Sequence, residues 1–333
     1  MFAQAARFDG KVISKKSNAI VVQYEDGSTK SVELGRRYGA AAGLTIAHNV
    51  TTDMKEGEFF KKGDIIAYND GFFEKDIFNP KNVVWKMGVT AKTVLYESTE
   101  THEDASSISK RLAEKLTTKV TKIKTVVVSF DQDVKNILQP GNVVEHRTIL
   151  CTIEDAVTSN AGLFDEKTLD TLKLFSNQTP TAKTKGVLER IEVYYHGEKE
   201  DMSPSLKALS DTSDKMFASK QRALGKQVFT GSVDEGFRID GDPLQMDTLA
   251  IRFYMTNDVP AGVGDKGVFT NQMKTVFSKV MDYEMKTESG AVIDAVFGQK
   301  SIDDRIVNSA LSIGTTNTLL SVIGKKAVEI YKS

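Results

Sequence analysis

GDKGVFTNQMKTVFSKV, residues 264–280, is the segment of this chain that carries the strongest indication of a fold. Gly264 permits a tight backbone turn, and Asp265 can hold that turn by hydrogen bonding to neighbouring backbone groups. The turn would aim Lys266 away from the sheet or barrel beneath it, and Lys274 follows on the same segment. An ammonium group is a compact charge that suits phosphate, so two lysines here predict contact with a polyanion. The alternative is a solvated surface loop.

The composition is that of a soluble globular protein. The chain has 333 residues, enough for two or three domains, of which 40% are hydrophobic and 27% charged. A net charge of −1 excludes binding of nucleic acid by overall charge, so such contact requires a local basic surface or a partner chain. Because the chain lacks both an apolar run of about eighteen residues and a signal-peptide core, we expect a cytoplasmic protein without membrane contact.

One cysteine and four scattered histidines exclude several kinds of site. Cys151 alone cannot form an intrachain disulfide or a multi-cysteine metal site, and it fits a reducing compartment. We expect it to be an inert, buried thiol in a strand. The histidines, at positions 48, 102, 146 and 196, lack the spacing of metal ligands. We therefore predict no metal held by this chain alone.

Short β-branched runs separated by turn residues predict a β-rich fold. Asp26-Gly27 is a strong hairpin signal. A Gly-Asp or Gly-Asn turn also stands at the start of a strand in three places, at residues 62–66, 140–144 and 262–266. This repeated pattern is typical of small barrels built from hairpins. Longer strands are expected at residues 186–195, 248–255, 276–280 and 291–297. We expect a β-rich α+β fold with peripheral helices and not a doubly wound α/β fold.

Apolar residues at helical spacing predict several helices. Ser203-Pro204 starts one helix, and Gly225 ends it. The apolar stripe of this helix consists of Leu206, Leu209, Met216, Phe217 and Leu224. Other helices are expected at residues 105–117, 164–175, 302–311 and 315–331, with a brief helical turn at 134–138.

Read in order, these segments resemble the C-terminal half of the β subunit of multi-subunit DNA-directed RNA polymerases. The hallmark of that family is GDKxAGRHGNKGVxSK, and residues 264–279 have the same length and the same two lysines, Lys266 and Lys274. Residues 241–255, GDPLQMDTLAIRFYM, resemble the strand that leads into the hallmark. Residues 290–296, GAVIDAV, resemble the family's GxPVDIV.

The resemblance extends collinearly over almost the whole chain. Residues 102–112, HEDASSISKRL, are similar to the family's FEDxxxxSERL element, and Arg305 falls at the arginine of its PSR segment. Residues 12–27 and 60–71 resemble an earlier hairpin and a V-x-x-G-D-x-x-A-D-G run. Residues 138–153 and 185–195 resemble the strands that bracket the family's flap.

The chain also departs from the family's pattern. Residues 267–273, GVFTNQM, replace the AGRHGN filling, so its arginine and histidine are absent. Residues 298–304, GQKSIDD, stand where the family has NPLGVP, and the flap region is brief. Such brevity resembles the split, compact β subunits of large bacterial viruses, which another polypeptide completes.

The resemblance implies an architecture of small barrels, one of them a double-psi β-barrel. Residues 1–120 would form a barrel and hairpin part of the region that holds the RNA–DNA hybrid. Residues 121–236 would be a flap-like insertion, and residues 237–333 would supply double-psi barrel strands and C-terminal helices.

The resemblance also implies roles for five residues. Lys266 and Lys274 would contact phosphates at the RNA 3′ end and on the nucleotide. Arg305 would clamp the β and γ phosphates, the alternative being an ion pair on a helix surface with Asp303 or its neighbours. Two more residues, Glu103 and Asp104, would lie near the second metal ion, the alternative being helix N-terminal acids favoured by the macrodipole.

The magnesium of the reaction would come from a partner. In the family the ions sit on three aspartates of the β′ chain, and Ile239-Asp240-Gly241-Asp242 lacks that D-x-D-x-D spacing. We interpret Asp240 and Asp242 as turn residues that introduce the strand at 248–255. The chain would therefore be inactive alone. Its implied partners are β′-like and N-terminal β-like subunits, the DNA template and RNA–DNA hybrid, and nucleoside triphosphates.

The stripe Leu206, Leu209, Met216 and Phe217 has two interpretations. Its place in the flap implies a helix that docks a sigma-like initiation factor, and the alternative is packed core. Two other functions stay open for the whole chain. One is a virion structural or assembly protein built from β modules. The other is a non-catalytic polymerase homologue that regulates transcription, suggested by the altered loop 267–273.

Overall fold

The computed structural model describes residues 3–41, 44–76, 79–86, 88–155, 178–225, 231–270, 273–305 and 308–333. Contacts divide the chain into two units. Unit 1 comprises Met1–Lys86 and Lys119–Asp258, and unit 2 comprises Met87–Thr118 and Val259–Ser333. The unit boundaries thus fall after residues 86, 118 and 258. They differ from the boundaries expected from the sequence, which fall after residues 120 and 236.

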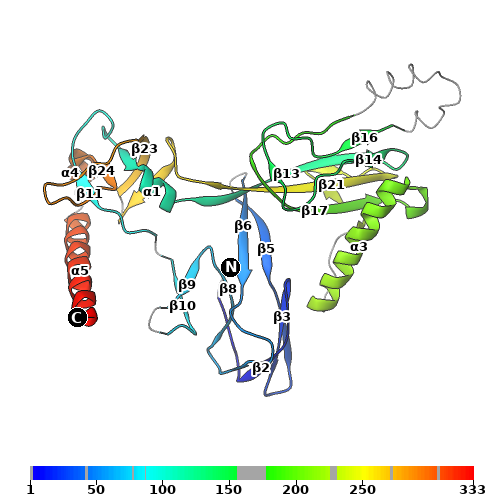
Figure 1. Ribbon diagram of the computed structural model, residues 1–333, viewed down its shortest axis with the longest axis horizontal. Coiled ribbons are helices and arrows are strands. Elements are labelled where there is room, and N and C mark those ends of the chain that lie inside the picture. Colours follow the sequence, from blue (N-terminus) through cyan, green and yellow to red (C-terminus); the bar gives the residue numbers. More distant parts are fainter. Residues whose placement is uncertain are drawn as a thin grey trace. The chain divides into compact units, whose positions relative to one another are not determined.

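A nine-stranded sheet is the centre of unit 1 (Figure 1). Its strand order is β1 (Gln4–Ala5), β8 (Ile65–Asn69), β6 (Leu44–Thr51), β13 (Thr118–Ser129), β21 (Thr248–Val259), β17 (Gly186–His196) and β15 (Val143–Val144), with β5 (Gly35–Ala41) beside β6 and β18 (Gly231–Ser232) beside β17. The antiparallel β17–β21 pair confirms the strands expected at 186–195 and 248–255. Leu249, Ile251 and Phe253 of β21 are fully buried in the main core of the unit.

A second sheet of unit 1 contains the expected hairpin. Its order is β4 (Thr29–Glu33), β3 (Ala19–Tyr24), β2 (Gly10–Lys16) and β7 (Phe59–Phe60). Gly27 has a φ of 82°, and the Ser28 amide donates to Asp26 Oδ1 (2.9 Å), as the Asp-Gly turn predicts. Val12, Ile20 and other apolar side chains of these strands form a separate core cluster.

Three two-stranded sheets complete the strands of unit 1. They are β9 (Phe73–Lys75) with β10 (Val83–Trp85), β14 (Asp133–Lys135) with β16 (Thr152–Glu154), and β19 (Arg238–Ile239) with β20 (Asp242–Pro243). The helical turn predicted at 134–138 is wrong, because Val134 pairs with Ile153 across β14 and β16. Asp240 and Gly241 form the turn between β19 and β20, both with positive φ, which confirms Asp240 as a turn residue. The same interpretation is wrong for Asp242, which is the first residue of β20 and pairs with Ile239.

Helix α3 (Pro204–Leu224) follows the short 3-10 helix η2 (Lys199–Asp201) and has the predicted ends. The Leu206 amide donates to the hydroxyl of Ser203, the residue before the helix (3.5 Å). Gly225 ends the helix in the left-handed conformation, with a φ of 63°. Lys220 of α3 pairs with Glu33 of β4 (2.7 Å), so the helix also packs on the β3–β4 hairpin.

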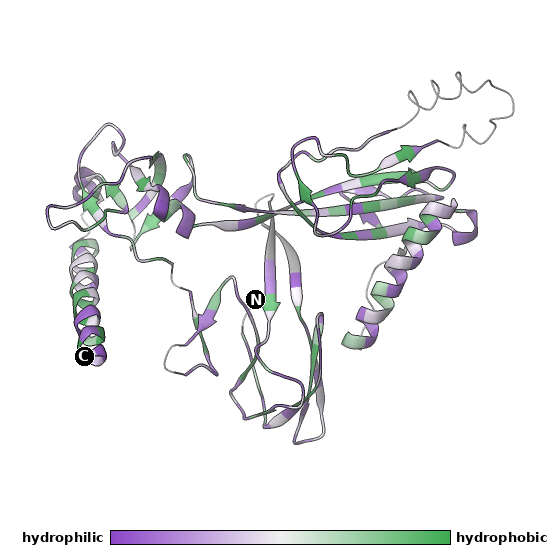
Figure 2. Cartoon of the chain, in the orientation of Figure 1, coloured by the Kyte–Doolittle hydropathy of each residue, from purple (hydrophilic) through white to green (hydrophobic). Residues whose placement is uncertain are grey.

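Unit 2 is built on a five-stranded mixed sheet. Its order is β11 (Thr93–Leu95), β24 (Ala295–Phe297), β12 (Ala105–Ser109), β23 (Met273–Met281) and β22 (Lys266–Phe269). Strands β11 and β24 are parallel, as are β12 and β23, and the other pairs are antiparallel. Its helices are α1 (Lys110–Lys115), α4 (Gln299–Arg305) and α5 (Asn308–Lys332). Figure 2 shows apolar residues in green along α5 and hydrophilic ones in purple near its C-terminal end.

Three helix predictions in unit 2 are wrong in part. Residues 105–109 form strand β12, because they pair with β23, and only 110–115 are helical. Ser109 then caps α1, accepting from the Leu112 amide (3.1 Å). The C-terminal helices have other limits than 302–311 and 315–331. The helix predicted at 164–175 lies outside the described residues.

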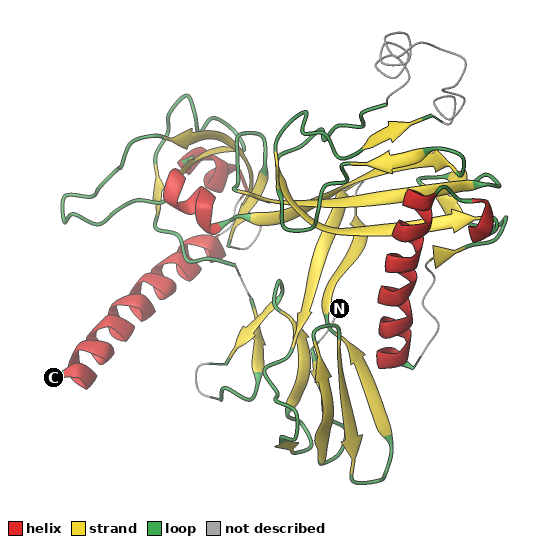
Figure 3. Cartoon of the chain, turned by 45° about the vertical axis from the view of Figure 1, so that its right-hand side comes forward, coloured by secondary structure: helices red, strands yellow, loops and turns green. Residues whose placement is uncertain are grey.

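The chain is therefore a β-rich α+β protein with several small sheets, as Figure 3 shows by the predominance of strands. In the described part of the chain, no helix combines the length and hydrophobicity needed to cross a membrane.

Candidate phosphate-binding site

The β22–β23 hairpin carries the two predicted lysines on one face. In its antiparallel register Lys266 lies opposite Val276, and Val268 lies opposite Lys274. Opposed residues and residues two apart share a face, so these four side chains project together, all of them exposed. Lys266 and Lys274 are then diagonal neighbours, about 7–8 Å apart at the backbone. Two ammonium groups at this spacing can contact successive oxygens of a phosphate chain.

The turn before β22 has the predicted construction. Gly264 has a φ of 91°, and its amide donates to the Phe277 carbonyl (2.8 Å). The Asp265 carboxylate accepts from the Gly262 amide (2.8 Å). Beneath the hairpin, a Cβ on Gly267 would lie 2.5 Å from the Phe277 ring. The absence of a side chain at Gly267 therefore lets β22 lie flat on the buried face of the sheet.

The turn of Glu103 and Asp104 runs beside the lysine strand. The Val276 amide of β23 donates to the Asp104 carbonyl (3.0 Å), and both acidic side chains are exposed. Glu103 has a φ of 54°, and its carbonyl accepts a hydrogen bond from the Ser301 hydroxyl. The structure thus brings this turn to the hairpin. The helix N-terminus alternative is wrong, because a whole strand, β12, separates these acids from α1.

Arg305 is the last residue of α4, and its side chain lies outside the described residues. Neither the predicted phosphate clamp nor the alternative ion pair with Asp303 can be placed. The start of α4 is held by the segment that follows β11, because the Lys300 amide donates to Glu97 Oε1 (2.6 Å).

A surface ion pair joins Glu100, which precedes the Glu103-Asp104 turn, to β23. Lys279 Nζ lies 3.0 Å from Glu100 Oε1. The hydrogen bond between them lowers the pKa of Glu100 and raises the pKa of Lys279. The Ser278 hydroxyl donates to the carbonyls of Glu100 and Ser106, the second at 3.1 Å. The Ser278-Lys279 end of the segment therefore ties β23 to Glu100 and to β12.

Sequence reasoning missed an ion pair between the half-exposed Arg111 and the buried Asp294. The Asp294 carboxylate is 4% exposed and accepts from Arg111 Nη2 (2.6 Å) and Nε (2.9 Å). Its second oxygen accepts from the Lys92 amide (2.9 Å). The pair links α1 to the strands β24 and β11. Both residues lie in segments of the resemblance, but no local pattern couples positions so far apart in the chain.

Two residues of the predicted docking stripe are covered by the chain itself. Leu206 is fully buried in the main core, and Phe217 is also buried. Leu209 packs partly against the same core, while Met216 is 44% exposed. The packed-core alternative therefore applies to Leu206 and Phe217, which a docking factor cannot reach.

Comparison with known proteins adds no relative. A scan of protein-family models gives no match to this chain, and a search of curated proteins gives none either. Among the described residues, no group of three or more His, Cys, Asp or Glu side chains is arranged to hold a metal ion. The function is therefore argued from the lysine face and its surroundings.

Proposed function

We propose that this chain is a subunit of a DNA-directed RNA polymerase, a compact β-type subunit that contributes Lys266 and Lys274 to the nucleotidyl-transfer centre. The observation that carries the proposal is the register of β22 and β23, which puts both lysines on one exposed face. Lysines on opposite faces could not serve one phosphate chain.

The chemistry of the reaction fits this division of labour. Phosphoryl transfer requires metal ions and positive charge around the triphosphate more than covalent help from the protein. A β′-like partner would supply the magnesium on its aspartates, and the two lysines would bind the phosphate oxygens. Glu103 and Asp104, beside the hairpin, would approach the second metal ion through water. Arg305 keeps its proposed contact with the β and γ phosphates.

The sheet of unit 2 supports a barrel at this centre. Parallel pairing of β12 with β23 joins segments that are far apart in the chain, and β11 pairs with β24 in the same way. We propose that these strands form part of a double-psi β-barrel. The complex would also contain an N-terminal β-like subunit, hold the RNA–DNA hybrid on its DNA template, and use a sigma-like factor. It would act in the cytoplasm of the host cell if it is viral.

The test is nucleotide addition by the complex assembled with its partner chains. Lys266→Ala and Lys274→Ala should each lower the rate of nucleotide addition by about tenfold or more. Each substitution removes a positive charge that would stabilise the negative charge developing on the phosphate oxygens. Lys286→Ala is the matched control, since Lys286 is an exposed lysine of the same unit whose partner is Glu284 (3.5 Å). Wild-type rates in both site variants would remove the proposed roles, and the isolated chain should not polymerise nucleotides.

Two further observations separate the alternatives. Co-purification with a β′-like chain supports the polymerase, and recovery only in particles or capsid precursors supports a virion protein. Transcription by the reconstituted complex from a defined template excludes a homologue that only regulates.

A further inference from the structure

The single tryptophan of the chain, Trp85 at the end of β10, is 52% exposed. A tryptophan side chain is the largest apolar surface that a residue can offer and is usually covered in a folded protein. An aromatic ring left in solvent at a fixed position is therefore a candidate binding surface.

Aromatic neighbours fix the position of the Trp85 ring. Phe72 stacks on it, with ring centres 5.6 Å apart and planes at 8°, and His48 lies against Phe72 at 5.4 Å. Phe73, the cross-strand partner of Trp85, meets it edge-on at 5.2 Å. The Lys86 amide also donates to the Phe72 carbonyl (2.8 Å). His48, Phe72 and Trp85 thus form a column of rings, and about half of the surface of its last member, Trp85, is exposed.

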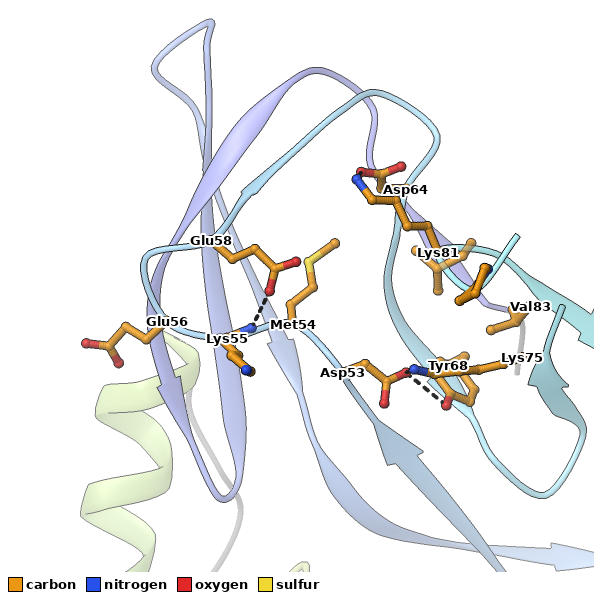
Figure 4. Close-up of a pocket in the computed structure, with 12 residues that line it drawn as sticks. Asp53, Met54, Lys55, Glu56, Glu58, Asp64, Tyr68, Lys75, Lys81 and Val83 are labelled. Carbon is orange, nitrogen blue, oxygen red and sulfur yellow. Dashed lines mark hydrogen bonds and ion pairs between the residues drawn. The ribbon is translucent and has the colours of Figure 1, made fainter. Parts of the chain in front are cut away.

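A polar cavity adjoins this column on the same face of the hairpin. Lys75 lies opposite Val83 in the β9–β10 register, on the face of Trp85, and both residues line a cavity of about 620 Å³ (Figure 4). Its wall holds Asp53, whose carboxylate accepts from the Tyr68 hydroxyl (3.1 Å) and pairs with Lys75 (3.2 Å). The cavity therefore offers hydrogen-bond donors and acceptors on the face of the hairpin that carries Trp85.

The charges around the cavity are close to balance. Its lining contains four carboxylates and three ammonium groups, from Asp53, Glu56, Glu58, Asp64, Lys55, Lys75 and Lys81. Lys81 is held by Asp64 at 3.4 Å, as Lys75 is by Asp53. This is not a groove that attracts a polyanion by charge, and it is too polar for a broad apolar protein surface. It suits a flat group with a polar edge.

We propose that Trp85 is a stacking platform for an unpaired nucleobase, with the adjoining cavity facing the polar edge of the base. The choice of a nucleobase as the ligand rests on the proposed polymerase function. The base can come from a single strand or from a free nucleotide, since both present the same ring. Because the site has little net charge, binding depends on stacking and changes little with salt concentration.

The single tryptophan allows a direct test on the full-length chain. Trp85 fluorescence is measured while short single-stranded RNA, single-stranded DNA, a duplex of the same sequence, or a nucleoside monophosphate is added. Saturable quenching by a single strand and not by the duplex is the expected result. Equal affinity for the monophosphate identifies the free nucleotide as the source, and tighter binding of the strand identifies the strand. Quenching by the duplex alone, or by none of the probes, overturns the proposal.

Variants complete the test through the anisotropy of a labelled oligonucleotide. Trp85→Leu should weaken binding by about 5- to 100-fold, the loss expected for one stacked base, and Trp85→Phe should restore most of it. Phe59→Leu is the matched control, because Phe59 is an aromatic of the same unit that is 74% exposed and lies under Lys11 Nζ rather than in a ring column. Wild-type affinity in Trp85→Leu overturns the platform. This outcome is independent of the rates of the Lys266 and Lys274 variants, so the two proposals can fail separately.

Discussion

Helices α3 and α5 are the longest helices of the described chain, and their surroundings are opposite. In α3, three apolar residues of the predicted stripe, Leu206, Phe217 and Leu224, are buried. In α5, among the residues described, Ala310 alone is buried, and apolar residues such as Leu320 are more than half exposed. Both helices are amphipathic, so their sequences alone do not explain this difference.

Long-range contacts explain it. Helix α3 packs on β14 and β17 and on the β3–β4 hairpin, which comes from the start of the chain. Helix α5 joins the core of its unit through Ala310, which lies in a cluster with Met273, Phe297 and Ile302. An apolar stripe thus predicts a helix, while the distant segments decide whether its stripe is covered within the chain.

The largest expected effect of this difference is on thiol reactivity. Cys151 is buried in the core cluster that also contains Leu206. We expect its modification by a thiol reagent at pH 8 to be at least about 1,000-fold slower than that of a thiol placed on α5 by Ser321→Cys in a Cys151→Ala chain, since a buried thiol reacts only when the fold opens. Mass spectrometry measures both rates, and denaturant should make them equal. Comparable rates in the native chain would contradict the buried core beside α3.

A leucine truncation in each helix is the next largest test. Leu206→Ala should lower the free energy of unfolding by about 2–5 kcal/mol, because it leaves a cavity in a full core. Leu320→Ala in α5 should change it by less than about 0.5 kcal/mol, because the side chain is already exposed. Urea unfolding followed by circular dichroism measures both values. Similar losses in the two variants would show that α5 is covered as α3 is.

The core beside α3 should also give a pH dependence. Burial raises the pKa of the Cys151 thiol from 9.0 to about 11. Between these values the folded state keeps a proton that the unfolded state releases, so stability is intact below pH 9 and falls as the pH rises toward 11. Urea midpoints at increasing pH should fall further in the wild-type chain than in Cys151→Ala. The same decline in both chains would exclude a contribution from this thiol.

The glycine that ends α3 and a glycine inside α5 should respond to alanine with opposite changes in stability. Gly225, after α3, has a φ of 63°, and a Cβ there would meet no atom, so Gly225→Ala should cost about 1 kcal/mol of backbone strain alone. Gly314 lies inside α5 with open space around it, so Gly314→Ala should stabilise the helix by about 0.5–1 kcal/mol. Urea midpoints test the first, and helical circular dichroism tests the second. A loss of helix in Gly314→Ala would mean that α5 needs this glycine for another contact.

Local signals predicted those parts of the fold that depend on neighbouring residues. Ser203-Pro204 and Gly225 gave both ends of α3, because capping is decided within one turn of the helix. The helix predicted at residues 105–109 is wrong, because these residues form strand β12. The spacing of Ile108 and Leu112 favours a helix, but pairing with β23 outweighs it.

In the candidate site, too, the features that depend on neighbouring residues could be predicted from the sequence, and those that depend on distant contacts could not. The Gly264 turn follows from its own sequence, and alternation along β22 and β23 puts Lys266 and Lys274 on one face once the hairpin is known. The pairing of Arg111 with Asp294 depends on how α1 meets β24, so nothing near either residue indicates it.

The smallest expected effect concerns the lysines on the two helices. Lys220 of α3 reaches Glu33 of β4 at 2.7 Å, and both side chains are largely covered. Lys220→Ala should therefore cost up to about 1 kcal/mol, the upper range for a pair near the surface, and the cost should shrink in high salt. Lys325→Ala on the exposed α5 should leave the urea midpoint unchanged at any salt concentration. If Lys220→Ala lowers the free energy of unfolding equally at every salt concentration, the loss comes from packing of the Lys220 methylene groups on the hairpin and not from the ion pair. Such a loss would still distinguish the covered helix α3 from the exposed helix α5.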